Sequence, residues 1–168
     1  MAVMATVFTM SSTVQPRERS LTGLRRPCSI GPMLITTGNK SEVSVGYATL
    51  YGDMNGGFNP IKDLYKTQVY ALARYRNRER SKGCLGPKGR VIPENVLTKA
   101  PTAELKHDQR DQDTLPPYDV LDDILNCLVE LELPVRDIVA RGHAPEIVKK
   151  VERMLYLAEY KRRQAAPG

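Results

Sequence analysis

The stretch Met33-Leu34-Ile35-Thr36-Thr37-Gly38-Asn39-Lys40-Ser41-Glu42 decides the fold class. Residues 33–36 form a short, partly β-branched apolar run that ends before Gly38, which predicts a buried strand of a parallel sheet. A turn and a short helix from Glu42 to Ala48 are expected to follow. A strand followed by helices, with polar loops at the joins, indicates an α/β fold. Since one or two strands cannot hide the edges of a sheet, the chain is expected to be part of a larger α/β domain.

The segment after this unit changes from loop to helix. Residues 51–60 are rich in glycine and asparagine, which predicts an irregular loop. Asp63 is the expected N-cap of a helix that runs to about Arg76. The apolar face of this helix is expected to consist of Val69, Leu72 and Ala73.

Two amphipathic helices are expected to close the chain. The first has one apolar face, with Cys127 beside it, formed by Leu121, Ile124, Leu125, Leu128 and Val129. The second has Pro145 in its first turn and is expected to end at residues 161–163. Its apolar stripe consists of Ile147, Val148, Val151, Leu155 and Ala158. A short helix between them is expected to begin near Pro134, with Gly142 as its C-cap.

Composition limits the class of protein. The chain has 168 residues, the size of one ordinary domain or of a piece of a larger one. Its apolar stretches are far shorter than the ~20 residues that cross a bilayer, which excludes a membrane-spanning protein. Three widely spaced cysteines and two histidines indicate neither a disulfide framework nor a zinc site. We therefore expect a cytoplasmic protein with no membrane partner.

Charge and disorder are concentrated in two segments. Arg74 to Arg90 holds seven basic residues and one acid, so its net charge of +6 equals that of the whole chain. Such a cluster can bind nucleic acid, but interleaved glycine, serine and proline favour a solvated loop.

Residues 1–31 are rich in arginine and serine, which is typical of a transit peptide or of a misread segment. We predict that residues 1–31 are disordered and form no part of a packed core.

Several polar residues are placed where an α/β fold binds ligands. Ligands of open α/β sheets lie beyond the carboxyl ends of the strands. Thr37 there can hold a nucleotide and Glu42 a hard cation, although Thr-Gly-Asn serves equally well as a turn that leads into a helix. Lys66 can meet a phosphate or remain a solvated lysine. From the residues alone, the chain is part of a nucleotide-handling α/β domain.

Six blocks occur in an order that resembles one family. They are residues 36–42 (TTGNKSE), 45–53 (VGYATLYGD), 66–67 (KT), 99–105 (KAPTAEL), 115–119 (LPPYD) and 159–164 (EYKRRQ). Together they closely resemble the synthetase domain of glutamine-dependent NAD⁺ synthetase. The resemblance runs from about Gly31 to Gly168, and it implies that residues 32–168 are the C-terminal part of such a synthetase domain, whereas residues 1–31 lie outside the family or are frameshifted.

The resemblance implies a fold and a reaction. The implied fold is a partial Rossmann-like adenine nucleotide alpha hydrolase (ATP pyrophosphatase) fold, mostly helical in this chain. The implied enzyme is a carbon–nitrogen ligase, in which ATP and Mg²⁺ adenylate the nicotinate carboxylate of deamido-NAD⁺ and release pyrophosphate. Ammonia, derived from glutamine in a separate nitrilase-like domain, then gives NAD⁺ and AMP. A homo-oligomer, or association with full-length synthetase, is also implied.

The resemblance also assigns roles to individual residues. It implies contacts to ATP from Thr37, Lys66 and Thr102. It implies that Glu42 contacts both magnesium and deamido-NAD⁺, and that Lys161 holds deamido-NAD⁺.

Two further segments carry weaker assignments from the same resemblance. Asp53 is a lesser candidate for the site. The polar segment from Lys106 to Pro117 resembles a mobile loop that covers the site and excludes the water that would hydrolyse the adenylate.

The sequence departs from the family in ways that affect function. The phosphate loop S-G-G-x-D-S and the glutaminase region are absent, so the pyrophosphate and the metal lose their main cradle. We therefore expect that this polypeptide alone does not make NAD⁺. Residues 14–19 loosely match the family's I-Q-A-R-x-R-G, and the residues that follow do not, which favours an upstream frameshift.

Two alternative functions stay open. The chain can be a non-catalytic assembly or decoy subunit of a synthetase, or a basic nucleic-acid-binding module, although nucleic acid is not the expected partner.

Overall fold

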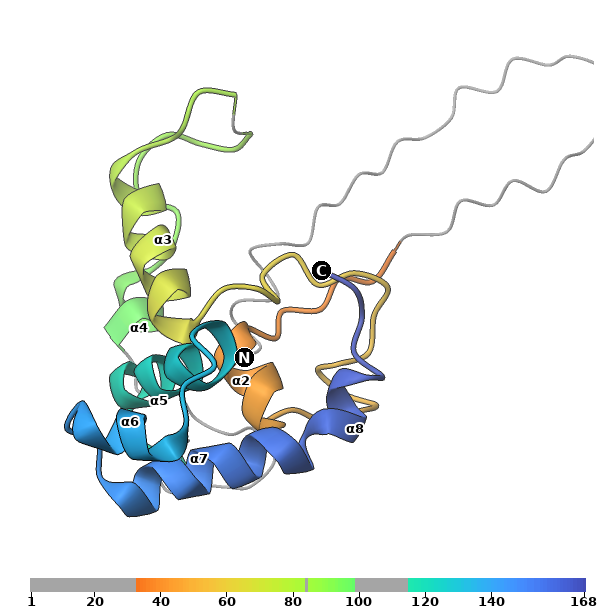
Figure 1. The fold of residues 1–168 in the computed structure, drawn as a ribbon. Helices are drawn as coiled ribbons and strands as arrows, with labels where there is room; N and C mark the ends of the chain where they lie inside the picture. The colour runs from red at the N-terminus through yellow and green to blue at the C-terminus, as the bar shows by residue number, and fades with distance from the viewer. Residues whose placement is uncertain (1–32, 84, 99–114) are drawn as a thin grey trace, which may run out of the picture.

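Short helices make up most of the structure. The computed structural model describes residues 33–83, 85–98 and 115–168. In chain order its helices are α2 (Lys40–Val45), α3 (Lys66–Arg78), α4 (Glu94–Thr98), α5 (Tyr118–Leu125), the π-helical turn η2 (Asn126–Glu130), α6 (Val135–Ala140), α7 (Pro145–Leu157) and α8 (Glu159–Arg162). Helix α2 contacts α3, α5, α7 and α8, so it lies at the centre of the helical packing (Figure 1). None of the helices in these ranges is long and apolar enough to cross a membrane.

The predicted buried strand is reduced to one pair of residues. Ile35 forms a single parallel bridge with Phe58, and the Thr36 amide donates to the Phe58 carbonyl at 2.9 Å. Met33 and Leu34 are 62% and 59% exposed, so the prediction of burial is wrong for these two residues. Within residues 33–83, 85–98 and 115–168, no further strand lies beside them. An apolar run of this kind is buried only when neighbouring elements cover it.

Local sequence explains why α2 is short. Asn39 caps its N-terminus, since its side chain accepts from the Glu42 amide at 3.0 Å and the Glu42 carboxylate accepts from the Asn39 amide at 3.3 Å. Gly46 ends the helix with a left-handed φ of 70°. A Cβ at Gly46 would lie 2.8 Å from the Cβ of Ala158, so glycine lets α8 approach the end of α2. The helix begins two residues and ends three residues earlier than predicted.

The start of α3 differs from the prediction. The helix begins at Lys66, and Tyr65 rather than Asp63 is its N-cap residue. The buried carboxylate of Asp122, from α5, accepts a hydrogen bond from the Thr67 amide at 2.9 Å. Because another helix satisfies this amide, the chain does not need a local aspartate cap.

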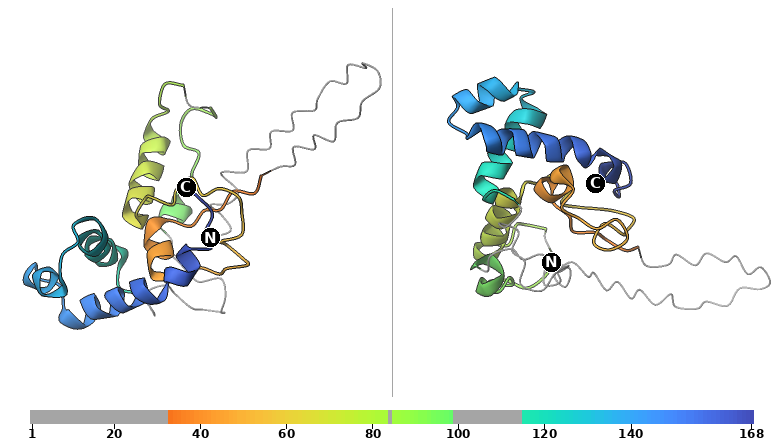
Figure 2. Two further views of the ribbon diagram at one scale, coloured as in Figure 1. Left: turned by 45° about the vertical axis from the view of Figure 1, so that its right-hand side comes forward. Right: turned by 90° about the horizontal axis from the view of Figure 1, so that it is seen from below.

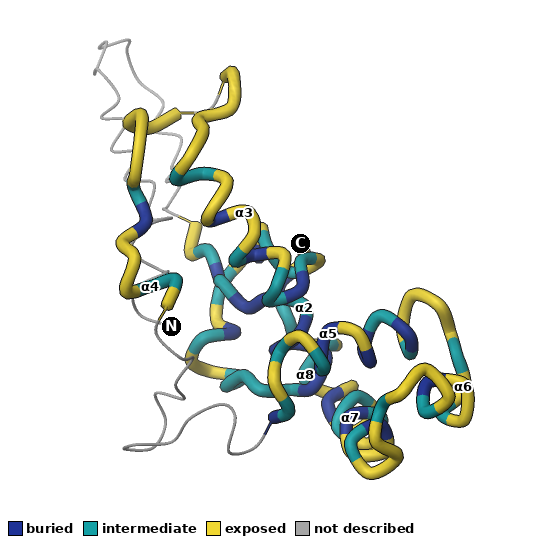
Figure 3. Tube along the Cα trace, turned by 90° about the vertical axis from the view of Figure 1, so that its left-hand side faces the viewer, coloured by how far each residue is buried: buried dark blue, intermediate teal, exposed yellow. Residues whose placement is uncertain are grey.

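Helix α3 extends away from the rest of the packing, with α4 beside it (Figures 1 and 2). Figure 3 shows that much of this pair is exposed. On α3, Val69 and Ala73 are buried as predicted, whereas Leu72 is half exposed. The helix ends at Arg78, close to the predicted end, and the irregular loop predicted over residues 51–60 is confirmed.

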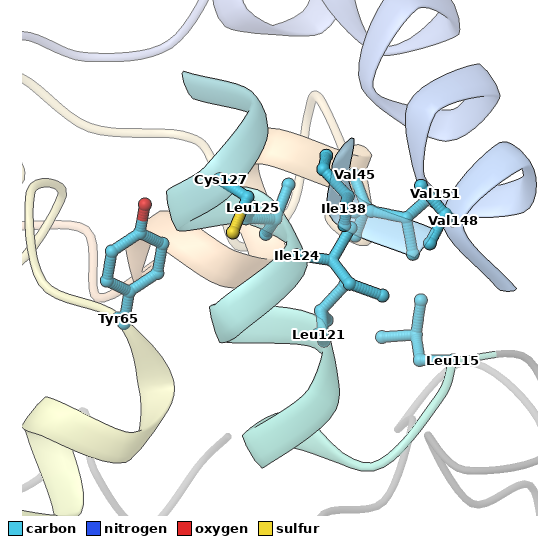
Figure 4. Packing of buried hydrophobic residues seen from close by; sticks show 10 residues of the cluster. All are labelled: Val45, Tyr65, Leu115, Leu121, Ile124, Leu125, Cys127, Ile138, Val148 and Val151. Atoms are coloured by element: carbon cyan, nitrogen blue, oxygen red, sulfur yellow. The ribbon is translucent and has the colours of Figure 1, made fainter. Parts of the chain in front are cut away.

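The hydrophobic core lies where α5 and α7 pack together and against α2 and α6. Figure 4 shows the apolar side chains of α5 directed toward those of α7. The largest fully buried apolar side chains are Leu121, Ile124, Leu125, Ile138, Val148 and Val151. Burial of a side chain of this size contributes about 1.5–3 kcal/mol. The core therefore fixes α5 and α7, and through them α2.

The apolar face of the first closing helix changes direction at η2. Helix α5 ends at Leu125, and the chain continues as a π-helical turn, which contains more residues per turn than an α-helix. Cys127 is fully buried, whereas Val129 is 39% exposed. The prediction of one buried face that includes Val129 is therefore wrong, because the wider turn rotates the later side chains.

The C-terminal helices follow the prediction more closely. Helix α6 has Pro134 as its N-cap residue, and Gly142 follows its end with φ of 103°. Pro145 is the first residue of α7, as predicted. The last helix does not run unbroken to its basic end, because the chain breaks at the buried Ala158 and continues as α8.

Candidate functional site

Glu42 and Lys66 form the centre of the candidate site. The Glu42 side chain, in the first turn of α2, is 3% exposed, and the Lys66 side chain, at the start of α3, is 14% exposed. The Lys66 ammonium lies 2.7 Å from Oε1 of the Glu42 carboxylate. A buried carboxylate needs a partner of opposite charge, and Lys66 supplies it. Two residues predicted to contact ATP and magnesium are therefore in direct contact with each other.

A buried polar network holds this pair in place. The Asp122 carboxylate accepts from the Ser41 hydroxyl through Oδ1, and from the Thr67 amide and hydroxyl through Oδ2. The Lys66 amide donates to the Ser41 hydroxyl oxygen at 2.9 Å. Ser41 is fully buried and Asp122 is 6% exposed. The network connects α2, α3 and α5, so it fixes the backbone from which Lys66 projects.

Two tyrosine rings face the Lys66 ammonium. The ammonium lies 5.3 Å from the ring centroid of Tyr118 and 5.9 Å from that of Tyr70. Contacts of a cation with an aromatic face at this range are favourable. Since Tyr118 begins α5, side chains from α2, α3 and α5 converge on one cation.

Thr37 lies at the same end of α2 as this pair, whereas Asp53 contacts the backbone of its own loop. Thr37 is half-buried and precedes Asn39 by two residues, which span at most about 7 Å. The Glu42 carboxylate accepts from the Asn39 amide, so Thr37 and this carboxylate lie at the same end of α2. Asp53 belongs to the following loop, where its Oδ1 accepts from the Thr49 amide at 2.5 Å.

Lys161 lies at the opposite end of α2. Its ammonium donates to the carbonyls of Gly46 and Ala48, at 2.7 and 2.6 Å. The six residues of α2 rise about 9 Å, so the structure does not place this ammonium beside Glu42. Lys161 links α8 to the C-terminal end of α2. The predicted site residues therefore lie at both ends of α2 and do not form one cluster.

The arginines after Lys161 make a separate set of contacts. Arg163 and Arg162 both donate to the Glu159 carboxylate, at 3.0 and 2.8 Å. These hydrogen bonds, first that of Arg163, hold the pKa of Glu159 below its ordinary value. Arg162 also donates to the Ser44 carbonyl at 2.6 Å. The basic end of α8 therefore contacts α2 through Arg162. Its positive charge also complements the dipole of α8.

Some predicted residues cannot be placed, and one important residue had no sequence signal. Thr102 and residues 106–114 of the predicted covering loop lie outside the described residues. Asp122 was missed because it occupies a polar position of an amphipathic helix, far along the chain from Ser41 and Thr67. Only the packing of α5 against α2 and α3 reveals its role.

The candidate site is compatible with a magnesium ion bound jointly by protein and substrate, but not with a metal ion bound by protein side chains alone. Within the described ranges, no group of three or more His, Cys, Asp or Glu side chains could hold a metal ion. Magnesium is usually held by one or two carboxylates together with substrate phosphates and water. The single Glu42 carboxylate, which already faces a cation, is compatible with that set of ligands.

Comparisons with known proteins agree on one family. A family model described as NAD synthase matches residues 4–165. The glutamine-dependent NAD(+) synthetase of Rhodobacter capsulatus is 50% identical over 155 residues, which cover 92% of this chain and 28% of that protein. The chain spans 22–28% of the length of the curated relatives it matches. The matched range begins upstream of residue 31, and the proposed boundary there stays a prediction.

Two solved structures resemble the fold. The NH3-dependent NAD synthetase of Campylobacter jejuni, solved with a nitrate ion, has a TM-score of 0.51 at 26% identity, over 77% of this chain and 42% of its own. The NMN synthetase of Francisella tularensis has a TM-score of 0.56 at 25% identity, over 77% of this chain and 44% of its own. They confirm the predicted fold class, a partial Rossmann-like α/β fold that is mostly helical in this chain.

Proposed function

The chain belongs to the NAD synthase family, and we propose that it forms one side of a cleft in which ATP activates the carboxylate of deamido-NAD⁺. The observation that carries this proposal is the buried Glu42–Lys66 pair, on which three helices converge. In the proposed reaction the carboxylate attacks the α-phosphorus of ATP and pyrophosphate leaves. Ammonia then attacks the acyl-adenylate, loses a proton and displaces AMP. Activation is needed because a carboxylate is a poor electrophile.

The proposed roles follow from charge. Magnesium would neutralise part of the phosphate charge, and Glu42 would be one of its ligands. Lys66, at the first turn of α3, would contact a phosphate oxygen. Thr37, at the same end of α2, contacts ATP, and Thr102 is proposed to do the same. Lys161 is proposed to hold deamido-NAD⁺ by exchanging a backbone carbonyl for a ligand oxygen.

The identity of the amidated nucleotide rests on the relatives. One structural neighbour is named an NMN synthetase, so the fold alone does not choose the nucleotide. The curated relatives near 50% identity are named for NAD(+), and that name favours deamido-NAD⁺. We also propose a cytoplasmic location, which the sequence analysis predicted.

Binding of nucleotide is the direct test. We expect MgATP to raise the unfolding temperature of the 168-residue chain and EDTA to remove most of the effect. The double variant Glu42→Gln/Lys66→Met keeps the pair neutral and should lose the magnesium-dependent part. Lys149→Met, an exposed substitution on α7, serves as control. An equal magnesium-dependent shift in the wild type and the double variant would contradict the proposed site.

We further propose that the chain does not make NAD⁺ alone. No S-G-G-x-D-S sequence occurs in the 168 residues, so the backbone amides that would cradle pyrophosphate are not supplied by that motif. Purified chain incubated with deamido-NAD⁺, MgATP and ammonia should yield no NAD⁺. Measurable NAD⁺ formation would overturn this part of the proposal.

Association with a second copy, or with full-length synthetase, remains part of the proposed function. Tyr156 and Leu157 at the end of α7 are 72% and 64% exposed, which leaves apolar surface uncovered within the described chain. Sedimentation velocity should show self-association that Tyr156→Ser/Leu157→Ser weakens. A monomer at all accessible concentrations would contradict homo-oligomer formation.

A further inference from the structure

Helices α3 and α4 border an open hollow of about 580 Å³, which we name the α3–α4 pocket. Its lining contains three arginines: Arg74 and Arg78 on α3, and Arg90 at the end of the basic loop. This volume lies within the range of about 300–1,000 Å³ found for small-molecule sites, and the hollow is open to solvent. These arginines belong to the basic segment 74–90, and the proposed synthetase function assigns that segment no role.

The charge in the pocket is positive. The one acid in its lining is Glu94, which forms an ion pair with Arg90. Arg74 and Arg78 are four residues apart on α3 and therefore project from the same face of the helix. Both lie in exposed positions, where water keeps a guanidinium charged and reachable. Two arginines on one wall and a third across the hollow can bind one anion from two sides.

Hydrogen bonds hold the far wall of the pocket in place. Asn77, also in the lining, accepts from the amides of Val91 and Ile92 at 3.0 and 2.9 Å, and donates to the Ile92 carbonyl at 2.8 Å. Arg76 donates to the Pro87 carbonyl at 2.7 Å. These contacts fasten the returning loop to α3. Arg90 is thereby set opposite α3 rather than on a free loop.

Apolar surface completes the lining. Ala71 on α3 and Leu97 on α4 contribute side chains without charge. Arg74 also lies over the ring of Tyr70, with its guanidinium carbon 5.9 Å from the centroid. Guanidinium groups match the geometry of phosphate, and apolar side chains suit the face of a base. This combination favours a small organic phosphate over a long polyanion, which needs a continuous basic track.

The pocket is separate from the Glu42–Lys66 pair. Arg74 follows Lys66 by eight residues on the same helix, a rise of about 12 Å, and Arg78 lies one turn further away. Neither Glu42 nor Lys66 lines the α3–α4 pocket, although the Tyr70 ring lies 5.9 Å from both the Lys66 ammonium and the Arg74 guanidinium carbon. We propose that the α3–α4 pocket is a second ligand site, which takes a phosphate-bearing small molecule of nucleotide size.

Calorimetric titration of the full chain tests this proposal. The titrations use ATP, AMP, pyrophosphate and adenosine as probes, in the wild type and in the Glu42→Gln/Lys66→Met background, which removes the proposed ATP site. We expect ATP and pyrophosphate to bind in both, and adenosine to bind at least tenfold more weakly than ATP. The variant Arg74→Gln/Arg78→Gln should lose about tenfold or more in affinity for pyrophosphate, because it removes two charge-assisted donors. The exposed variant Lys149→Gln/Lys150→Gln should bind as the wild type does.

A substitution at Glu94 is expected to raise the affinity for pyrophosphate, whereas the arginine substitutions lower it. Glu94→Gln removes the acid and releases Arg90 from its ion pair, so pyrophosphate should bind several-fold more tightly. This gain separates binding from a loss of fold. The proposal is overturned if the wild type binds none of the phosphates, if Arg74→Gln/Arg78→Gln binds them unchanged, or if Glu94→Gln weakens binding. Tighter binding of a short single-stranded oligonucleotide than of ATP, lost in the same arginine variant, would assign the surface to nucleic acid instead.

The outcomes are independent of the proposed synthetase function. Loss of magnesium-dependent stabilisation in Glu42→Gln/Lys66→Met concerns the first site alone. Retention of pyrophosphate binding in that background concerns the α3–α4 pocket alone, so the two proposals can fail separately.

Discussion

Asp122 Oδ2 accepts hydrogen bonds from both the amide and the hydroxyl of Thr67, at 2.9 and 2.8 Å. Its other oxygen accepts from the buried hydroxyl of Ser41. One carboxylate of α5 therefore joins α2 to the first turn of α3, where it also meets the positive end of the α3 dipole. The contact explains how Lys66, on that first turn, is held opposite Glu42.

We expect Asp122→Asn to lower the free energy of unfolding by about 2–3 kcal/mol. The amide keeps the shape of the side chain but replaces a charged acceptor of three hydrogen bonds with a neutral group. Urea unfolding measures the change. Asp119→Asn, at an exposed position of the same helix, should cost about 0.5 kcal/mol or less. Equal effects at the two positions would show that the network contributes nothing specific.

The same network shows where sequence reasoning succeeds and where it stops. The family resemblance predicts that Glu42 and Lys66 belong to one site, and the structure brings the two side chains into contact. Asp63 was predicted as the cap of α3 from local chemistry, but Asp122, far away in sequence, supplies the carboxylate. Local patterns cannot reveal a cap that arrives through tertiary packing.

A second limit of the sequence concerns burial. Apolar residues at 33–36 predict a covered strand, yet Met33 and Leu34 are exposed, since burial depends on neighbours that a pattern does not contain. The helical periodicity around Leu121 and Val148 predicted the core correctly. It failed at Val129 because periodicity assumes a regular α-helix and η2 is wider.

The Glu42–Lys66 pair should behave as a coupled unit. Glu42→Gln and Lys66→Met alone should each cost about 3 kcal/mol, since each leaves a largely buried charge without its partner. The double variant should cost less than the two single variants together, with a coupling energy of about 2 kcal/mol. Urea unfolding of the four proteins completes the cycle. Additive losses would mean that the ion pair does not persist in solution.

Gly46→Ala should destabilise the chain by more than its backbone conformation alone explains. A side chain there is strained by φ of 70° and meets the Cβ of Ala158 at 2.8 Å, so we expect a loss of about 2–4 kcal/mol. Gly142→Ala is the matched control, because φ is 103° but nothing lies within 4 Å of the added Cβ. Its cost should be about 1–2 kcal/mol. Equal losses would show that α8 does not press against Gly46.

Tyr65 should make stability fall in alkaline solution. Burial, followed by the negative charges of Glu130 and Asp122, raises the pKa of Tyr65 to about 12. Because this value lies above the ordinary 10.0, the folded state holds the phenolic proton more tightly than the unfolded state does. The resulting stability is complete below about pH 10 and is lost as pH rises toward about 12, a change of about 2–3 kcal/mol.

Comparison of two phenylalanine variants isolates this titration. Tyr65→Phe cannot ionise, so its free energy of unfolding should fall less than that of the wild type between about pH 9 and about pH 11. Tyr51→Phe, at a position 89% exposed, should follow the wild type. Parallel curves for the wild type and Tyr65→Phe would place the phenol in water rather than in the core.

Lys161 distinguishes a structural contact from a ligand contact. Its ammonium donates to two carbonyls beyond α2, so Lys161→Met should lower the free energy of unfolding by about 1.5–3 kcal/mol, because both acceptors lose a charged donor. Lys161→Arg retains the charge and should lose less. If Lys161→Met leaves stability unchanged but abolishes stabilisation by deamido-NAD⁺ in thermal unfolding, the ammonium serves the ligand and not the fold. If both quantities fall together, the lysine serves both, since a cation held by two backbone carbonyls can exchange one of them for a ligand oxygen without leaving α2.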